Sequence, residues 1–219
     1  MIMATGQHPE PDPGEMAANA TLESPVMVIG QEFVTQHPVD LEMMQKTLGL
    51  GMNDCKVTDE DGNLIFQVKS KIATVRDIRY LQDADGNILV SLKHKLMTAH
   101  GRWEVFRGES IEQKDLLFSV KQSSLFQLVS SKLHVFLPSN TTESVPDFRI
   151  EGAFIDSSCT IYLGNSNTIV AQMHQQHNLK STIRWKDDFQ VTVCPNVDYA
   201  FIIVLVVILD ATEDNDDKI

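Results

Sequence analysis

The chain has 219 residues, of which 42% are hydrophobic, so it can build one sizeable core or two small ones. Its net charge of -12 is concentrated at the ends: residues 1–45 hold seven acidic residues and no Lys or Arg, and residues 210–219 hold five acidic residues and one Lys. The remaining stretch, 46–209, has seventeen basic and eighteen acidic residues. This balance argues against general nucleic-acid binding, which requires a basic stripe.

The cysteines and the N-terminus bear on the cellular compartment. Cys55, Cys159 and Cys194 are odd in number and far apart with no CxxC pair, so they predict buried thiols in a reducing compartment, without disulfides or zinc. The N-terminus lacks the basic and apolar regions of a secretory signal. We therefore expect a cytoplasmic protein, with the nucleus or the membrane periphery as alternative locations.

The first part of the chain changes character twice. Residues 1–25 contain four prolines among Gly, Ala, Asn and acidic residues, which predicts a disordered acidic leader. Segments 26–29 and 32–35 predict a first short strand, interrupted by a glycine. Apolar residues at helical spacing in 39–50, after a proline and before two glycines, predict an amphipathic helix.

A repeated hairpin signal follows. DEDGNLIFQVK at 59–69 and DADGNILVSLK at 83–93 both place Asp-Gly-Asn between alternating strands, which predicts two β-hairpin turns with Gly at φ > 0. A calcium loop of the EF-hand type is the alternative. It would need Gly at position six and Glu at position twelve, but position six is Leu64 or Ile88, and position twelve is not Glu in either loop.

Short alternating segments continue almost to the end of the chain. We predict strands at 55–58, 64–70, 78–82, 88–94, 102–107, 116–121, 125–129, 133–137, 148–151, 159–163, 168–173 and 189–194. A series of about a dozen such strands is typical of a sandwich or a closed barrel, because closure removes exposed sheet edges.

The most apolar stretch is YAFIIVLVVIL at 199–209. As a helix it would span about 16 Å, against about 30 Å of bilayer hydrocarbon, so we expect no transmembrane segment. A segment that is apolar on every side must instead be enclosed by protein. Its length favours a helix and its many β-branched residues favour a strand. A buried helix would fit as the plug of a closed barrel.

Several motifs carry a family resemblance, in order along about 31–212. They are HGRWEVFRG (100–108), DLLFSVKQSS (115–124), LHVFLPSN (133–140), DFRIEGAF (147–154), IVAQMHQQH (169–177) and PNVDYAFIIVLVVILD (195–210). With these motifs the chain resembles the plant LURP-one-related family. The resemblance implies a tubby-like fold: a mainly β, twelve-stranded closed barrel around a hydrophobic C-terminal helix at 197–210. We thus expect one barrel domain at 26–212 and an acidic tail at 213–219.

The resemblance implies less about function. Tubby proteins and phospholipid scramblases share this superfamily fold, some relatives bind phosphoinositides and act as membrane-tethered transcription regulators, and family members are linked to pathogen defence. The tubby lipid-binding motif and the scramblase calcium motif match no positions in this sequence. These functions therefore enter by analogy of fold.

No pattern in the sequence predicts catalysis. There is no GxSxG elbow, P-loop or dinucleotide motif, so we expect a non-enzymatic protein with no catalytic residues and no cofactor. His174 and His177 are three residues apart, but on a strand they face opposite sides, and no third ligand lies nearby in the sequence. We expect surface or loop positions for them and no metal site.

The candidate binding residues are lysines that follow the two hairpins. Lys69 and Lys71 share one strand face, as do Lys93 and Lys95, and Arg76, Arg79, His94 and Arg102 lie nearby in the sequence. Together these lysines predict a site for the head group of an anionic phospholipid. The plain alternative is a set of solvated outward positions. The competing function is a protein-interaction module in defence signalling, with an unknown protein partner contacting the acidic ends.

Overall fold

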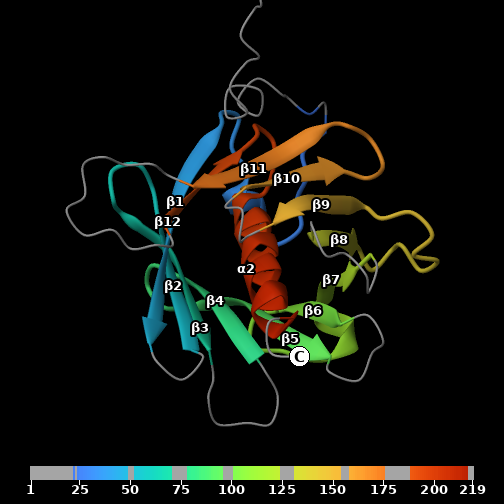
Figure 1. Cartoon of the computed structure of the whole chain (residues 1–219), viewed down its shortest axis with the longest axis horizontal. Coiled ribbons are helices and arrows are strands. Elements are labelled where there is room, and N and C mark those ends of the chain that lie inside the picture. Colours follow the sequence, from blue (N-terminus) through green and yellow to red (C-terminus); the bar gives the residue numbers. More distant parts are fainter. Residues whose placement is uncertain are drawn as a thin grey trace, which may run out of the picture.

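The barrel expected from the sequence is present. The computed structural model describes residues 22, 24–48, 52–70, 78–95, 101–123, 131–153, 158–175 and 188–216. Within these ranges, twelve antiparallel strands follow one another in chain order, and β1 pairs with β12 to close the barrel. The C-terminal helix α2 runs through its centre (Figure 1). The mainly β, closed-barrel fold class implied by the family resemblance is confirmed.

The elements have the following bounds. The strands are β1 (Val39–Leu48), β2 (Met52–Thr58), β3 (Leu64–Ser70), β4 (Ile78–Asp83), β5 (Ile88–Lys95), β6 (Arg102–Arg107), β7 (Leu116–Gln122), β8 (Ser131–Phe136), β9 (Phe148–Ala153), β10 (Ser158–Leu163), β11 (Ile169–Gln175) and β12 (Asp188–Val193). The helices are η1 (Gln31–Phe33), η2 (Gln113–Asp115) and α2 (Tyr199–Asp216).

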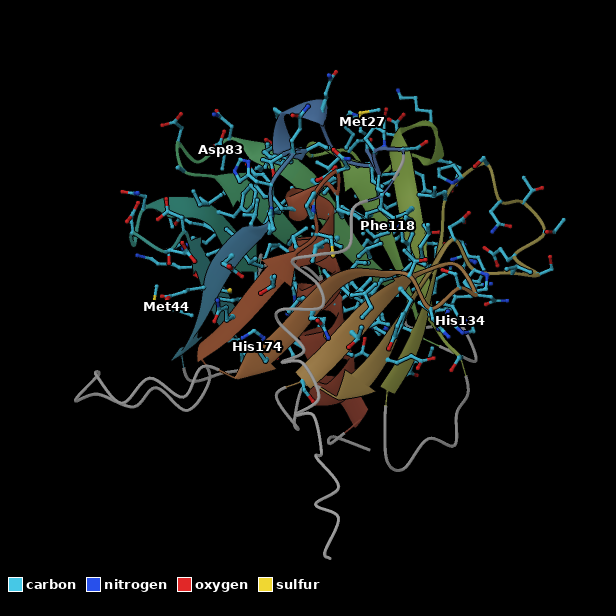
Figure 2. The ribbon with its side chains drawn as sticks, turned by 90° about the horizontal axis from the view of Figure 1, so that it is seen from above. Met27, Met44, Asp83, Phe118, His134 and His174 are labelled. Carbon is cyan, nitrogen blue, oxygen red and sulfur yellow. The ribbon has the colours of Figure 1, made fainter. Side chains whose placement is uncertain are left out.

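The core is the interface between the barrel wall and α2. Alternate strand residues point inward and are buried, while their neighbours form the outer face. On α2, every side chain from Ala200 to Leu209 is at most 3% exposed. Phe201 packs edge-on against Phe118 and Phe148, each with ring centroids 5.0 Å away, and Figure 2 shows Phe118 on the helix side of β7. Enclosing this apolar helix contributes on the order of 10–25 kcal/mol before entropy is subtracted.

Asp198 fixes the point where α2 enters the barrel. Its Oδ1 accepts a hydrogen bond from the backbone N–H of Phe201 at 3.0 Å, which caps the first turn of the helix. Its Oδ2 accepts three more, from the backbone N–H groups of Val28, Ile29 and Gly30 at 2.7–3.1 Å. Asp198 is fully buried. One carboxylate therefore ties the N-terminal segment to the start of the helix.

The two predicted Asp-Gly-Asn turns are confirmed. Gly62 and Gly86 have φ values of 82° and 89°, which an L side chain rarely adopts. In each turn the first aspartate accepts hydrogen bonds from the asparagine four residues later: Asp59 from the backbone N–H and Nδ2 of Asn63, and Asp83 from the same groups of Asn87. These carboxylates therefore shape the turns from within.

The helix predicted over 39–50 is wrong: this stretch contains β1. Buried apolar residues also recur at every second position of this segment, since Leu41 and Met43 are each 1% exposed. Backbone pairing with β2 on one side and β12 on the other decides between the two periodicities. Closing the barrel requires a strand here, and this tertiary requirement overrides the helical spacing.

The strand predicted at 26–29 and 32–35 is also wrong. Only two isolated bridges form there, between Val26 and Val197 and between Val34 and Asp198, and η1 lies between them. The Asp198 carboxylate turns the backbone at 28–30 inward, so no continuous strand forms. The strand predicted at 125–129 lies outside the described residues.

We predict that Asp198→Ala lowers the free energy of unfolding by about 3–5 kcal/mol, because it removes the helix cap and leaves three backbone N–H groups without their acceptor. Equilibrium unfolding in urea measures the change. The matched control is Asp85→Ala in the exposed β4–β5 turn, which we expect to cost less than about 0.5 kcal/mol. Equal losses for the two variants would show that Asp198 does not hold this junction.

Candidate anion-binding face

A row of basic side chains crosses the outer wall of the barrel. Strand register places five residues opposite one another in sequence on β5 to β9. We call this row the basic ladder; its members are Lys95, Arg102, Lys121, His134 and Arg149. Side chains alternate along each strand, and the inward positions on these strands are held by the core residues Leu92, Trp103, Val120, Leu133 and Ile150, so all five ladder residues point outward. Figure 2 shows His134 at the periphery of the barrel. Adjacent strands are about 4.8 Å apart, so the ladder is about 19 Å long.

Carboxylates accompany the ladder along its length. Lys95 Nζ lies 2.5 Å from Glu104 Oε1, and Glu104 is 5% exposed. At the other end, Arg149 donates to Glu151, to the carbonyls of Gly164 and Ser166, and its guanidinium lies 4.4 Å from the centroid of the Tyr162 ring. Arg149 is therefore committed to holding the β10–β11 turn.

The middle of the ladder is held by a carboxylate from a distant loop. Glu143, in the connection between β8 and β9, accepts from Arg102 at 2.8 Å and also pairs with Lys121. The same Arg102 nitrogen, Nη2, donates to Ser119 Oγ at 2.7 Å. Burial raises the pKa of Glu143, but hydrogen bonds from Lys121 and Arg102 outweigh it, so the pKa is lowered overall. This part of the wall therefore favours negative charge.

Of the four lysines predicted to bind a head group, the structure brings two together on one strand. Lys93 and Lys95 lie on the outer face of β5, and Lys95 belongs to the ladder. Lys69 is on the outer face of β3, separated from them by β4, and its Nζ lies 3.0 Å from Asp54 Oδ2. Lys71 lies outside the described residues, as does Arg76.

Arg79, which the sequence grouped with these lysines, points into the barrel instead. It is 7% exposed, with Nη1 3.9 Å from Asp210 Oδ2 on α2 and its guanidinium 5.8 Å from the Trp103 ring centroid. His94 stacks on the same tryptophan with centroids 4.7 Å apart. These residues form a buried polar cluster near the C-terminal end of the helix, on the opposite side of the wall from the ladder.

Sequence reasoning missed Lys121, His134 and Arg149. Each is a polar residue within an alternating segment, so its outward direction could be inferred from the sequence. Their alignment could not, because it depends on the register between strands, and an irregularity shifts the register of β6 and β7 at Val105/Phe106. Only the paired strands show that these residues share a row with Lys95 and Arg102.

The barrel and its motifs agree with comparisons to known proteins. A family model described as LURP-one-related matches residues 39–210. The chain belongs to the LURP-one-related family. Three Arabidopsis thaliana relatives are similar to it over most of its length. LURP-one-related 15 is 44% identical over 87% of both chains. LURP-one-related 10 is 41% identical over 87% of this chain and 99% of the relative. LURP1 is 40% identical over 86% of this chain and 90% of the relative.

A solved structure supports the same assignment. An Arabidopsis thaliana protein determined by X-ray crystallography aligns with a TM-score of 0.67 and 38% sequence identity, over 85% of this chain and 98% of that one. The LURP-one-related family is not known as an enzyme family. Across the described ranges, no helix combines the length and the apolar character that crossing a bilayer demands.

The thiols of this LURP-one-related barrel are buried, as the sequence predicted. Burial raises the pKa of Cys55 well above its ordinary value; Asp210 and Asp54 raise it further, and Arg79 partly opposes them. Burial alone raises the pKa of Cys194 to about 11. Both thiols therefore stay protonated in the folded state at pH values where an unfolded chain would release the proton.

We predict that stability falls as the pH rises above about 8.5, the pKa of a thiol in an unfolded chain. A thiol with a raised pKa in the folded state stabilises the fold fully below that pH, and loses this contribution at a rate of about 1.4 kcal/mol per pH unit above it. Urea unfolding from about pH 7 to 10 should give Cys55→Ala a shallower decline than the unsubstituted chain. Parallel declines would contradict a protonated Cys55.

Proposed function

We propose that this LURP-one-related chain is a non-enzymatic binding protein whose outer basic face takes the head groups of anionic phospholipids at a membrane surface. The observation that carries the proposal is the basic ladder on β5–β9, with Lys93 beside it on β5. Cations on adjacent strands lie at spacings that phosphate oxygens can bridge. Lys69, on the outer face of β3, extends this face beyond β4.

The location of the cations supports an external ligand. The centre of the barrel is occupied by α2, whose side chains between Ala200 and Leu209 are buried, so binding chemistry belongs on the outside of the wall. Residues 46–209 are close to neutral in total, so a local basic row matters more than net charge. Each Lys or Arg close to an anionic membrane contributes about 1 kcal/mol.

This function fits a peripheral protein at the cytoplasmic leaflet, where anionic lipids are concentrated. Defence signalling in plants, with coupling from the membrane to transcription, is the setting that the family resemblance suggests. The competing proposal is a protein-interaction module without a lipid ligand. The lipid proposal is preferred because the described outer face offers aligned cations.

We predict that the full chain co-sediments with vesicles containing a phosphoinositide and that replacing Lys69, Lys71, Lys93 and Lys95 together by Gln abolishes this binding. Loss of four cations at about 1 kcal/mol each lowers affinity by about a thousandfold. Binding should also weaken steeply with salt, because the screening length falls from about 30 Å at 0.01 M to about 8 Å at 0.15 M.

The control variant is Lys114→Gln, since Lys114 is an exposed lysine paired with Glu112 away from this face. We expect its binding to match that of the unsubstituted chain. Vesicle binding that survives the fourfold replacement would reject the lysine site. Absence of binding to any anionic vesicle, together with one stoichiometric protein partner in a pull-down from plant extract, would replace the lipid proposal by the protein-interaction module.

A further inference from the structure

Hydrogen bonds within the connection between β8 and β9 hold the Glu143 carboxylate against the basic ladder. Asn140 donates from Nδ2 to Asp147 Oδ2 at 2.9 Å and to the Val145 carbonyl at 2.8 Å. Asn140 Oδ1 accepts the backbone N–H of Glu143 at 3.1 Å, and Asp147 Oδ2 also accepts the N–H of Leu137. Two polar residues thus brace the loop from inside and set the position of Glu143.

The backbone conformation at Glu143 carries a cost. Its φ is 50°, in the left-handed region that non-glycine residues rarely adopt, at a cost of about 1–2 kcal/mol. The side chain is only 23% exposed. The ion pairs with Arg102 and Lys121 offset these costs, so the closed loop depends on the cations beneath it.

The site beneath Glu143 has donors that the carboxylate does not use. Arg102 Nε is buried and has no hydrogen-bond partner. The hydroxyl of Ser119, which is 2% exposed, accepts from Arg102 and keeps its own proton to donate. Lys121 Nζ, 5.4 Å from the Phe136 ring centroid, adds a second positive charge. A phosphate group has more oxygens and more negative charge than a carboxylate, so it suits this set of donors better.

We propose that Arg102, Lys121 and Ser119 form a phosphate-binding site and that Glu143 is its internal occupant, which a phosphate group must displace. This inference rests on the proposed lipid function for one source of the phosphate, a phosphoinositide head group; free inorganic phosphate is the other. The loop that carries Glu143 then acts as a gate. Because the site is competent only when Glu143 has left it, the gate weakens the apparent affinity for phosphate.

The test compares the full-length chain with Glu143→Gln, which keeps the shape of the side chain and removes its charge. We expect Glu143→Gln to bind phosphoinositide vesicles about fivefold more tightly, since an ion-paired occupant of this kind contributes about 1 kcal/mol. The matched control is Glu112→Gln, which neutralises a carboxylate paired with Lys114 on the β6–β7 connection. Its affinity should not change.

A second pair of variants tests the site itself. Arg102→Gln combined with Lys121→Gln should lose the vesicle binding and also cancel the gain produced by Glu143→Gln. Arg102→Lys keeps the charge and lacks the Nε donor, so we expect an intermediate loss. Thermal unfolding monitored by circular dichroism shows which variants are folded, and only folded variants are compared. Unchanged binding in the folded variants would overturn the proposal.

Two further outcomes separate this inference from the proposed function. If no variant binds vesicles, but Glu143→Gln binds inorganic phosphate more tightly than the unsubstituted chain in a calorimetric titration, the site and gate stand and the lipid function fails. If vesicles bind and all variants at 102, 121 and 143 match the Glu112→Gln control, the lipid function stands and the phosphate site fails.

Discussion

Enclosure of α2 is the constraint on which the rest of this structure depends. A helix that is apolar on every side has no face for solvent, so the strands must close around it and leave no open edge. The side chains that face inward on each strand pack against the helix, and this packing does not constrain the side chains that face outward. This division explains why the basic ladder, from Lys95 to Arg149, lies on the outer side of the wall.

Much of the fold could be predicted from the sequence because local signals agree with the tertiary structure there. The Asp-Gly-Asn turns and the alternating segments predict hairpins, and the apolar stretch at 199–209 predicts a segment enclosed by protein; a barrel satisfies all three. Residues 39–48 are different, since Leu41, Met43, Met44 and Leu48 fit both a helical and an extended period. The partner strands β2 and β12, distant from one another in sequence, decide the outcome, and no local pattern contains that information.

The candidate site could be predicted less well, for a related reason. The hairpin repeat correctly placed Lys93 and Lys95 on one outer face, because spacing within a strand is a local property. Which residues stand opposite them depends on register, and Arg79 shows the consequence: its position in the sequence is close to the lysines, but its side chain faces the helix. Glu143 could not be anticipated at all, since a loop that folds back onto the wall leaves no periodic signal.

Two buried aspartates fix α2 at separate points along its length. Asp198 is fixed by backbone groups where α2 enters, and Asp210 faces Arg79 with both side chains less than 10% exposed. Asp210 lies twelve positions after Asp198, about 18 Å along the helix axis. A helix displaced along the axis by one residue would leave a buried charge without its counterion, which is costly. The two aspartates therefore fix the position of α2 along the barrel axis. A change in the length of the helix would have to be matched by a change in the height of the barrel.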